Sequence, residues 1–318
     1  MKIYKYAFAI TSAFFILVIL ASCDSTGEGD SNAQASGEIE VVNHNVTSES
    51  EREVANFASG RFVPERQDDF AWENDKVAFR VYGPSSGGAG QVSGVDAWFK
   101  RVSYPVIDKW YAGYLAGQSY HEDHGEGYDP YHVGSSRGVG GTAIWLDGVA
   151  WPAAMYDQYE LIQSGGDVVE FRLQYEWDTP LGRVGESKTI SLEIGEQLYQ
   201  VSSVFTLNGE PESLPVAIGL TTHDEAAQTF SNPEQGRIST WELIDGNGVG
   251  TGALLAPDSI IETIHTPSDD KDASHIWLVT SSNENGELSF RAGFAWQAAQ
   301  EIDSIERWNE YLDARANQ

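Results

Sequence analysis

The 318-residue chain contains a single cysteine, Cys23, and few basic residues. One cysteine excludes a disulfide within the chain and a metal site built from several thiolates. Lysine and arginine number 19 against 48 aspartates and glutamates, and the formal net charge of −29 becomes −31 once the N-terminal signal described below is removed with its two lysines. A chain this acidic does not follow a phosphate backbone, which argues against nucleic acid as a partner.

Long apolar runs are also scarce, and the one at the N-terminus predicts export. Lys2 and Lys5 precede an apolar run that ends in Leu20-Ala-Ser-Cys23. The run is short for a membrane span and ends in small residues, as a cleaved signal peptide does. Leu-Ala-Ser-Cys resembles a bacterial lipobox, so we expect lipidation of Cys23; an incidental cysteine in a signal peptide is the alternative. We therefore expect an exported, lipid-anchored protein in the periplasm or at the outer-membrane surface.

Residues 24–37 are small and polar without apolar periodicity, which is typical of a flexible tether. Residues 38–318 suffice for one large domain or two small ones. Because all-β domains of this size are often single, we expect one catalytic domain there.

Most of that domain alternates apolar and polar residues in short segments separated by turn signals, which predicts strands with one buried face. Asn208-Gly209, between two alternating runs, is a strong hairpin signal. The pattern favours an all-β, antiparallel sandwich over an α/β fold. The expected strands cover residues 38–46, 52–57, 76–82, 95–101, 142–146, 156–163, 168–177, 186–194, 198–207, 216–222, 240–244, 251–255, 260–264, 276–280 and 288–296.

Only the C-terminus predicts a helix clearly. Asp303-Ser-Ile-Glu306 has capping-box spacing, and Ile305, Trp308 and Leu312 recur on one face of the helix that would follow. Residues 63–75 are expected to form a polar loop. Residues 104–115 fit either a short helix or an irregular segment.

The central stretch, residues 118–141, concentrates the side chains that carry chemistry. It contains His121, His124 and His132, the tyrosines Tyr120, Tyr128 and Tyr131, four carboxylates, Arg137 and six glycines, with almost no aliphatic residue. Such a segment is not a core strand, and its glycines permit tight turns. Binding and catalytic groups are often carried on such loops. A plain polar surface loop is the alternative.

Two chemistries fit this loop. His121 and His124, with the nearby carboxylates and His132, offer ligands for zinc or calcium, although His-x-x-His lacks the spacing of the helical zinc-protease motif. Acid and base chemistry fits better, because a histidine and a tyrosine hydroxyl can move protons at a sugar ring. No cofactor is expected.

An anionic substrate requires local positive charge in so acidic a protein. Removing a proton next to a carboxylate creates further negative charge, so such a site needs a cation or strong donors. Lys100, Arg101 and Arg137 are the candidates. In the alternating segment 95–101, Trp98 and Lys100 share a face that we expect to meet a ligand, and Trp98, Tyr128 and Tyr131 offer flat faces for sugar rings.

Several segments together resemble a bacterial family of unknown function over nearly all of residues 38–315. They are residues 65–75, the Ser-Gly-Val-Asp-Ala-Trp-Phe-Lys-Arg101 run, residues 120–127 with Tyr131 and the glycines to 141, and the Phe-Ala-Trp-Gln297 ending before the last helix. The resemblance implies a galactose-mutarotase-like β-supersandwich. It also implies a role in degrading uronate-rich polysaccharides, such as the dehydration of oligosaccharides of the algal polysaccharide ulvan to a 4,5-unsaturated uronic acid.

The roles that we expect from the chemistry follow. His121 or His124 removes the C5 proton, and Tyr120 or another histidine protonates the departing 4-hydroxyl. Alternatives are a sugar epimerase or mutarotase, and a carbohydrate-binding protein without activity. The substrate, an anionic oligosaccharide, is expected to contact Trp98, Lys100, Arg101, Tyr131, His132, Arg137 and His223, the last at the end of the strand predicted at 216–222.

Overall fold

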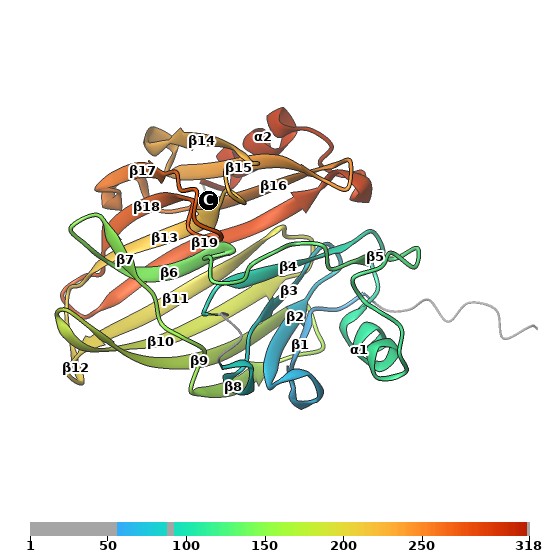
Figure 1. Ribbon diagram of the computed structural model, residues 1–318, viewed down its shortest axis with the longest axis horizontal. Coiled ribbons are helices and arrows are strands. Elements are labelled where there is room, and N and C mark those ends of the chain that lie inside the picture. Colours follow the sequence, from blue (N-terminus) through green and yellow to red (C-terminus); the bar gives the residue numbers. More distant parts are fainter. Residues whose placement is uncertain (1–55, 88–91, 317–318) are drawn as a thin grey trace, which may run out of the picture. The chain divides into compact units, whose positions relative to one another are not determined.

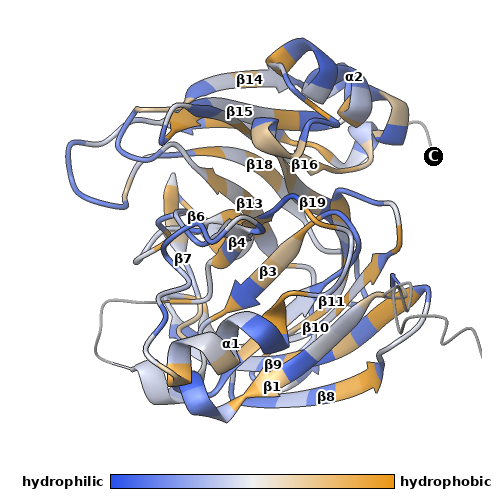
Figure 2. Cartoon of the chain, turned by 90° about the vertical axis from the view of Figure 1, so that its right-hand side faces the viewer, coloured by the Kyte–Doolittle hydropathy of each residue, from blue (hydrophilic) through white to orange (hydrophobic). Residues whose placement is uncertain are grey.

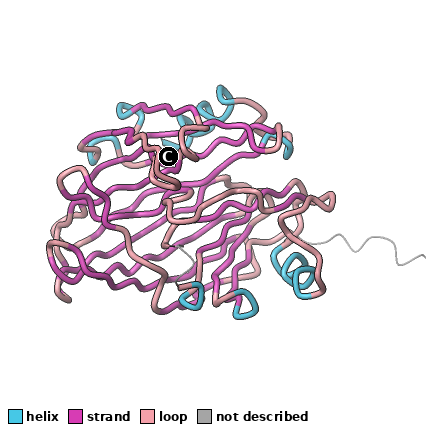
Figure 3. The backbone as a smooth tube through the Cα atoms, viewed as in Figure 1, coloured by secondary structure: helices cyan, strands magenta, loops and turns pink. Residues whose placement is uncertain are grey.

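The computed structural model describes residues 56–87 and 92–316, which belong to the compact unit Glu51–Gln318. The signal sequence with Cys23, the tether and the strand expected at residues 38–46 lie outside the described residues, as does most of the strand expected at 52–57. The described chain is mainly β-structure with two α-helices (Figure 1 and Figure 3).

The first of three antiparallel sheets contains five strands in sequence order, and helix α1 (Ile107–Leu115) packs against it. The helix lies between the fourth and fifth strands in the chain. It is therefore held beside the loop that leads into β5. The strands are β1 (Ser59–Val63), β2 (Asp69–Glu73), β3 (Ala78–Val81), β4 (Val95–Lys100) and β5 (Gly127–Tyr128).

The largest sheet has nine strands in the order β14-β15-β16-β19-β11-β10-β9-β8, with β12 paired to β11. Its strands are β8 (Gln158–Gln163), β9 (Val168–Thr179), β10 (Gly182–Glu193), β11 (Leu198–Leu207), β12 (Glu210–Pro211), β14 (Gln228–Asn232), β15 (Arg237–Ile244), β16 (Asn247–Leu254) and β19 (Glu287–Trp296).

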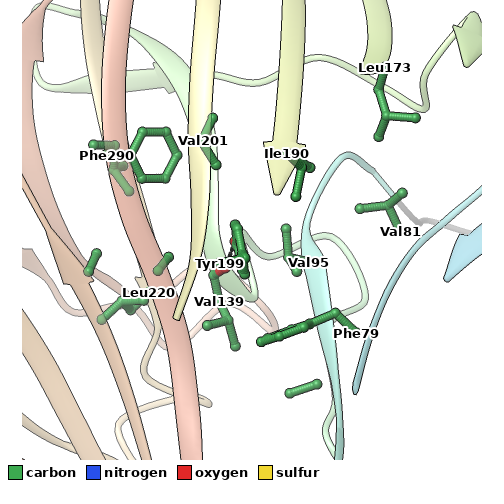
Figure 4. Close-up of a cluster of buried hydrophobic side chains, with 14 of the residues drawn as sticks. Phe79, Val81, Val95, Val139, Leu173, Ile190, Tyr199, Val201, Leu220 and Phe290 are labelled. Carbon is green, nitrogen blue, oxygen red and sulfur yellow. Dashed lines mark hydrogen bonds between the residues drawn. The ribbon is translucent and has the colours of Figure 1, made fainter. Parts of the chain in front are cut away.

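The third sheet follows the order β17-β18-β13-β6-β7, and the main core lies between the sheets. Trp72 of β2 packs 5.0 Å from Phe171 of β9, and Phe79 of β3 lies 5.0 Å from Tyr199 of β11. Figure 4 shows Tyr199 beside Val139 within this core. The strands of the third sheet are β6 (Val139–Leu146), β7 (Val149–Trp151), β13 (Pro215–Thr221), β17 (Glu262–Thr266) and β18 (His275–Ser281).

Period-two alternation decides which face of the large sheet meets this core. Along β9, Phe171 and Leu173 are buried, whereas Arg172 and Gln174 are partly exposed on the opposite face. Figure 2 shows hydrophilic and hydrophobic residues alternating along the strands of this sheet. Each fully buried large apolar side chain contributes about 1.5–3 kcal/mol relative to an exposed one, so a register slip by one residue would be costly.

The expected all-β, antiparallel supersandwich with a C-terminal helix is confirmed. The hairpin at Asn208-Gly209 is also confirmed, because Leu207 pairs with Glu210 and both turn residues have positive φ, as a two-residue hairpin turn requires. Residues 104–115, for which the sequence allows either a short helix or an irregular segment, contain α1. The expected loop at residues 63–75 is wrong, because Asp69–Glu73 form β2, a strand in which every residue is buried.

The C-terminal helix α2 (Ile305–Ala316) closes over β15 and β16. Its first turn is capped by Ser304, whose side-chain oxygen accepts a hydrogen bond from the backbone of Arg307 at 3.4 Å. Trp308 and Leu312 are fully buried, as the sequence predicts. Among the described residues, neither helix is long and apolar enough to cross a bilayer.

Candidate functional site

Helix α1 and the loop that follows it enclose a cavity of about 160 Å³, here called the loop pocket. It combines a helix face with the chemically rich part of the central stretch. Two of the three side chains expected to be catalytic, Tyr120 and His124, line it. The complete lining is Lys109, Trp110, Gly113, Gln118, Ser119, Tyr120, Glu122, His124, Glu126 and Gly127.

The loop is exposed to solvent, but hydrogen bonds between the Asp123 side chain and the loop backbone hold its turn. One oxygen of Asp123 accepts hydrogen bonds from the backbone N–H groups of Gly125 and Gly127, at 2.8 and 3.2 Å. At Gly127, which has φ of 121°, an added Cβ would lie 1.9 Å from the carbonyl oxygen of Phe99, so only glycine lets the loop approach β4 this closely. The turn is thus fixed, and with it the direction of the histidines.

The two loop histidines each have one ring nitrogen fixed by an acceptor. Nε2 of His124 lies 3.0 Å from the carbonyl oxygen of Ser119, and Nδ1 of His121 lies 2.7 Å from the carbonyl oxygen of Asp129. A carbonyl oxygen only accepts, so each of these nitrogens carries a proton. In the neutral rings, Nδ1 of His124 and Nε2 of His121 therefore hold free lone pairs, and both side chains are exposed.

Glu126 is the best-connected carboxylate in the loop pocket. It accepts hydrogen bonds from Lys109 at 2.5 Å, from Trp110 at 3.3 Å and from the hydroxyl of Tyr104. Although burial favours the neutral acid, these donors hold the pKa of Glu126 below its usual range. The same hydrogen bond raises the pKa of Tyr104 to about 12, so Tyr104 stays a donor at neutral pH. Of the residues that line the pocket, Lys109 alone carries positive charge.

Behind Tyr120 lies a buried charge cluster centred on Arg80. Its guanidinium pairs with Asp96 and with Asp129 at 3.1 Å, and donates to the hydroxyl of Tyr120 at 3.3 Å. Burial raises the pKa of Asp129 well above its usual value, and the neighbouring Asp96 adds to this. Burial likewise raises the pKa of Asp69 to about 6.

Asp129 links this charge cluster to His121. A carboxylate oxygen of Asp129 lies 3.5 Å from the same Nδ1 that bonds its backbone carbonyl, and the rings of His121 and Tyr120 are 4.5 Å apart. Asp129 thus orients the imidazole through Nδ1, which leaves Nε2 as the ring nitrogen that Asp129 does not occupy.

Residues 20–318 match the family described as "Domain of unknown function (DUF4861)". The chain belongs to this family. A relative from Formosa agariphila, "Uncharacterized protein P7", is 36% identical over 274 residues, which cover 80% of this chain and 66% of that protein. The matched part therefore spans about two thirds of the relative.

Two solved structures show a fainter similarity. The GH36 α-galactosidase AgaA of Geobacillus stearothermophilus is 8% identical with a TM-score of 0.34, over 72% of this DUF4861 chain and 40% of that chain. An α-galactosidase from Lactobacillus brevis is 10% identical with a TM-score of 0.32, over 79% of this chain and 42% of that chain. Scores this low carry no argument about substrate.

The expected ligand-facing surface of Trp98 and Lys100 is corrected by the DUF4861 structure. Both side chains are fully buried, because α1 covers this face of β4. The Trp98 ring stacks 5.6 Å from Trp110 and 5.0 Å from Tyr120. Lys100 donates to Glu73 at 2.9 Å and to two backbone carbonyls, so all three of its N–H groups are used inside the protein.

The two expected arginines differ in access. Arg137 is buried, and burial lowers its pKa to about 10; its side chain donates to Ser93 and to backbone carbonyls, so contact with a sugar carboxylate is excluded in this arrangement. Arg101 is about one-third exposed, pairs with Asp123 of the loop and lies over the ring of Trp296 at 4.7 Å. Arg101 does not line the loop pocket, but it contacts the same loop through Asp123.

Tyr131, His132 and His223 come together, but at a different place from the loop pocket. The His223 ring packs 4.6 Å from Tyr131, and its nitrogens lie 2.6 Å from a Glu242 oxygen and 2.7 Å from the carbonyl oxygen of His132. Burial opposes the charged form of His223, yet Glu242 raises its pKa above the usual value. Tyr131 is buried, so the expected stacking of Tyr131 on a sugar is not supported.

This second group is tied together by histidine–carboxylate pairs. His132 lies 2.8 Å from Asp272 and His265 lies 3.0 Å from Glu225. His223, Asp224 and Glu225 all have positive φ, a conformation that non-glycine residues seldom adopt. These contacts fix the loop that starts at Tyr131 against the ends of β13 and β18, a positioning role.

Tyr128 of β5 is buried and donates to Asp245 at 2.8 Å, so its ring does not offer a sugar platform. The alternative of a metal on the central loop also finds no support in the geometry. Across residues 56–87 and 92–316, no group of three or more histidine, aspartate or glutamate side chains is arranged to hold an ion.

Sequence reasoning missed four side chains of the candidate site: Lys109, Glu126 in its paired role, Arg80 and Asp129. A helical reading of residues 104–115 would have put Lys109 and Gly113 on one face, since they are four residues apart. No local signal points to Arg80, because its carboxylate partners are distant in sequence.

Proposed function

We propose that the protein is a carbohydrate-active lyase that removes water from the non-reducing-end uronic acid of an ulvan-type oligosaccharide, leaving a 4,5-unsaturated sugar. The resemblance described above suggests the substrate class, and the loop pocket supports the reaction type. The observation that carries the proposal is the pair of exposed imidazoles, each with one nitrogen held as a donor by a carbonyl and the other free.

The elimination needs one base and one acid. In the proposed reaction, Nδ1 of His124 takes the C5 proton, the C5–H electron pair forms the C4=C5 double bond, and the C4–O bond breaks. The 4-hydroxyl leaves as water after it accepts a proton from Nε2 of His121 in its charged form. Each general acid–base step of this kind contributes typically about 10²–10⁴-fold to the rate.

The substrate carboxylate must be held while the C5 proton is lost. Lys109 lines the loop pocket and Arg101 pairs with Asp123 of the same loop, and we propose these two cations in place of the buried Lys100 and Arg137. Each is paired with a loop carboxylate, Glu126 or Asp123. A uronate would share these cations, so the proposal requires that its binding loosen the existing pairs.

The buried cluster supports this reaction indirectly. Asp129 holds Nδ1 of His121, and Arg80 holds Asp129, so His121 keeps one orientation through proton gain and loss. The Tyr120 side chain is buried, with its hydroxyl against Arg80, whereas His121 is exposed; this supports His121 rather than Tyr120 as the proposed acid.

Incubation with saturated uronyl oligosaccharides tests the proposal. We expect loss of one water by mass spectrometry together with the ultraviolet absorbance of the new double bond. Cleavage into two sugars would indicate a lyase with a sugar leaving group. Binding without any change in mass or absorbance would refute an enzyme of this class and favour a binding protein.

The histidine roles are tested by substitution. His121→Asn and His124→Asn are each expected to lower turnover about 10²-fold or more while leaving the melting temperature unchanged. His265→Asn removes a partly exposed histidine from the other group and serves as the matched control. Turnover near wild type in either loop variant would remove that histidine from the reaction.

A sugar epimerase is the second candidate, and one observation favours it. His121 and His124 lie on the same loop and each has a ring nitrogen that no carbonyl occupies, and two bases on opposite faces of a carbon can invert its configuration. An epimerase would give a product of equal mass, without new absorbance, that differs from the substrate in its coupling constants by nuclear magnetic resonance.

A further inference from the structure

The outer face of the nine-stranded sheet carries a hollow region away from the core. Four cavities adjoin one another there, of about 220, 120, 490 and 470 Å³. The first two share Gln200, Arg291 and Arg315, and the last two share Gln174, Ser187 and Val204. Ser289 belongs to both the first cavity and the 490 Å³ cavity, so the four form one continuous depression, here called the outer trough.

The strand registers explain the outer trough. Arg172, Thr189, Ser202 and Ser289 lie opposite one another on β9, β10, β11 and β19, and Gln200 lies opposite Arg291 in the next outward row. These side chains alternate with buried ones, so they project from the face that does not meet the core. Hydroxyl and amide groups therefore line much of the trough, and such groups both donate and accept hydrogen bonds. Carboxylates also contribute to its lining, among them Glu176 and Glu287, so an acidic ligand would depend on a local cation.

Arg291 stands apart from the other arginines of the outer trough. Arg172 pairs with Glu160 at 2.7 Å, and Arg315 pairs with Glu196 at 2.7 Å. Arg291 makes one hydrogen bond, to the carbonyl oxygen of Arg315 at 3.2 Å, and pairs with no carboxylate among the described residues.

The single bond of Arg291 fits a role at the C-terminal end of α2, where a cation is favourable. This role uses one N–H group of the five that a guanidinium carries. The Arg291 side chain is partly buried in the trough, where Gln200 and Ser289 and the carboxylates Glu193 and Glu196 also line the cavities, although neither carboxylate pairs with Arg291. In a chain with a net charge of −29, a guanidinium without a carboxylate partner is a local site for an anion.

We propose that the outer trough binds an acidic polysaccharide, with a carboxylate or sulfate group on Arg291 and sugar hydroxyls along the row from Ser289 to Gln174. Its ligand class rests on the proposed function, but the site is separate. The loop pocket belongs to the sheet that packs on the inner face of the large sheet, whereas the outer trough lies on the opposite face. Binding there would keep the polymer near the enzyme and raise the local concentration of chain ends.

Affinity electrophoresis of the full mature chain tests the proposal with three polymers: polygalacturonate for carboxylates, dextran sulfate for sulfates and dextran as the neutral comparison. We expect the wild type to be retarded by at least one acidic polymer and not by dextran. Arg291→Gln should weaken this binding about tenfold or more, as the loss of a charge-assisted pair does. The polymer that loses binding identifies the anionic group.

Lys271→Gln is the matched control, because Lys271 is exposed, makes no ion pair among the described residues and loses the same charge. It should bind within about twofold of wild type, since exposed charges are largely screened. Ser202→Trp, which fills the middle of the trough, should also weaken binding. All three variants should keep wild-type turnover of short uronyl oligosaccharides. Arg291→Gln should lower the melting temperature by no more than about 4 °C, because a cation at a helix C-terminus contributes about 0.3–1 kcal/mol.

Unchanged binding in Arg291→Gln would overturn the proposal. Equal losses in Arg291→Gln and Lys271→Gln would also overturn it, because they would show diffuse charge attraction rather than a site. Equal retardation by dextran would refute the role of an acidic group. Arg291-dependent binding by a protein that turns over no uronyl oligosaccharide would support the trough and refute only the proposed reaction.

Discussion

Replacing Lys100 by methionine separates a structural lysine from a substrate-binding one. The side chain is fully buried and donates to Glu73, to the carbonyl oxygen of Asn74 and to that of Tyr104, at 2.8–2.9 Å. Methionine has similar volume but no donor. The change therefore leaves the Glu73 carboxylate without its cation and two carbonyl oxygens without their donor, while the packing of β4 is largely kept.

The size of the effect follows from these contacts. Removing one partner of a buried ion pair costs about 3–5 kcal/mol. This figure already includes part of the cost of leaving the two carbonyl oxygens without donors, so the two costs are not added. Glu73 keeps the backbone N–H groups of Val106 and Ile107, at 2.8–3.0 Å, which reduces the loss. We therefore expect the free energy of unfolding to fall by about 4 kcal/mol, or roughly 8–16 °C in melting temperature at this chain length.

Urea unfolding followed by tryptophan fluorescence measures this change, with Lys271→Met as the exposed control that should stay within about 0.5 kcal/mol of wild type. The double variant Glu73→Gln/Lys100→Met should recover part of the loss, because it leaves no unpaired buried charge. Wild-type stability in Lys100→Met combined with a large rise in KM would refute the structural role of Lys100 and indicate that Lys100 binds substrate.

Three further predictions concern pH, metals and the membrane. Burial lowers the pKa of His275 to about 4, and its neutral Nε2 accepts the backbone N–H of Arg137 at 2.9 Å. Because the pKa in the unfolded chain is about 6.5, neutral His275 contributes about 3 kcal/mol to stability above pH 6.5. This contribution is lost as the pH falls towards 4. Urea titrations at pH 7, 5 and 4 should show this loss in wild type and a flatter profile in His275→Gln; equal slopes would contradict it. Prolonged chelation should leave turnover and melting temperature unchanged. A fall in either quantity that zinc or calcium reverses would indicate that the loop histidines are metal ligands. Cys23→Ala should release the protein from membranes or block its processing, whereas wild-type protein found wholly in the soluble periplasmic fraction would contradict lipidation.

The strands were predictable where one face meets the core and the other meets water. The segment expected at residues 198–207 matches β11 because its side chains alternate in burial. The same rule failed at β2, where Asp69 and Glu73 bracket the strand with charge. Their partners Arg80 and Lys100 lie 11 and 27 residues along the chain, and no local pattern announces such pairing.

The site was predictable as a location but not in its detail. The density of histidine and tyrosine pointed to the central stretch, and Tyr120 and His124 line the loop pocket. Alternation correctly put Trp98 on one face with Lys100, but it cannot say what covers that face. Helix α1, whose periodicity is ambiguous in the sequence, covers that face. Lys100, expected to contact substrate, is therefore buried in the interior.

Helix α1 begins without a capping side chain of its own. The carboxylate of Glu73, at the end of β2, instead accepts hydrogen bonds from the backbone N–H groups of Val106 and Ile107. A nine-residue helix is too short to persist alone in water. We therefore expect α1 to form late, after β2 and β4 have paired with β3 and brought Glu73 and Lys100 together. The wall of the loop pocket would then be among the last parts to acquire amide-exchange protection during refolding, so a chain can be largely folded and still lack its reaction site.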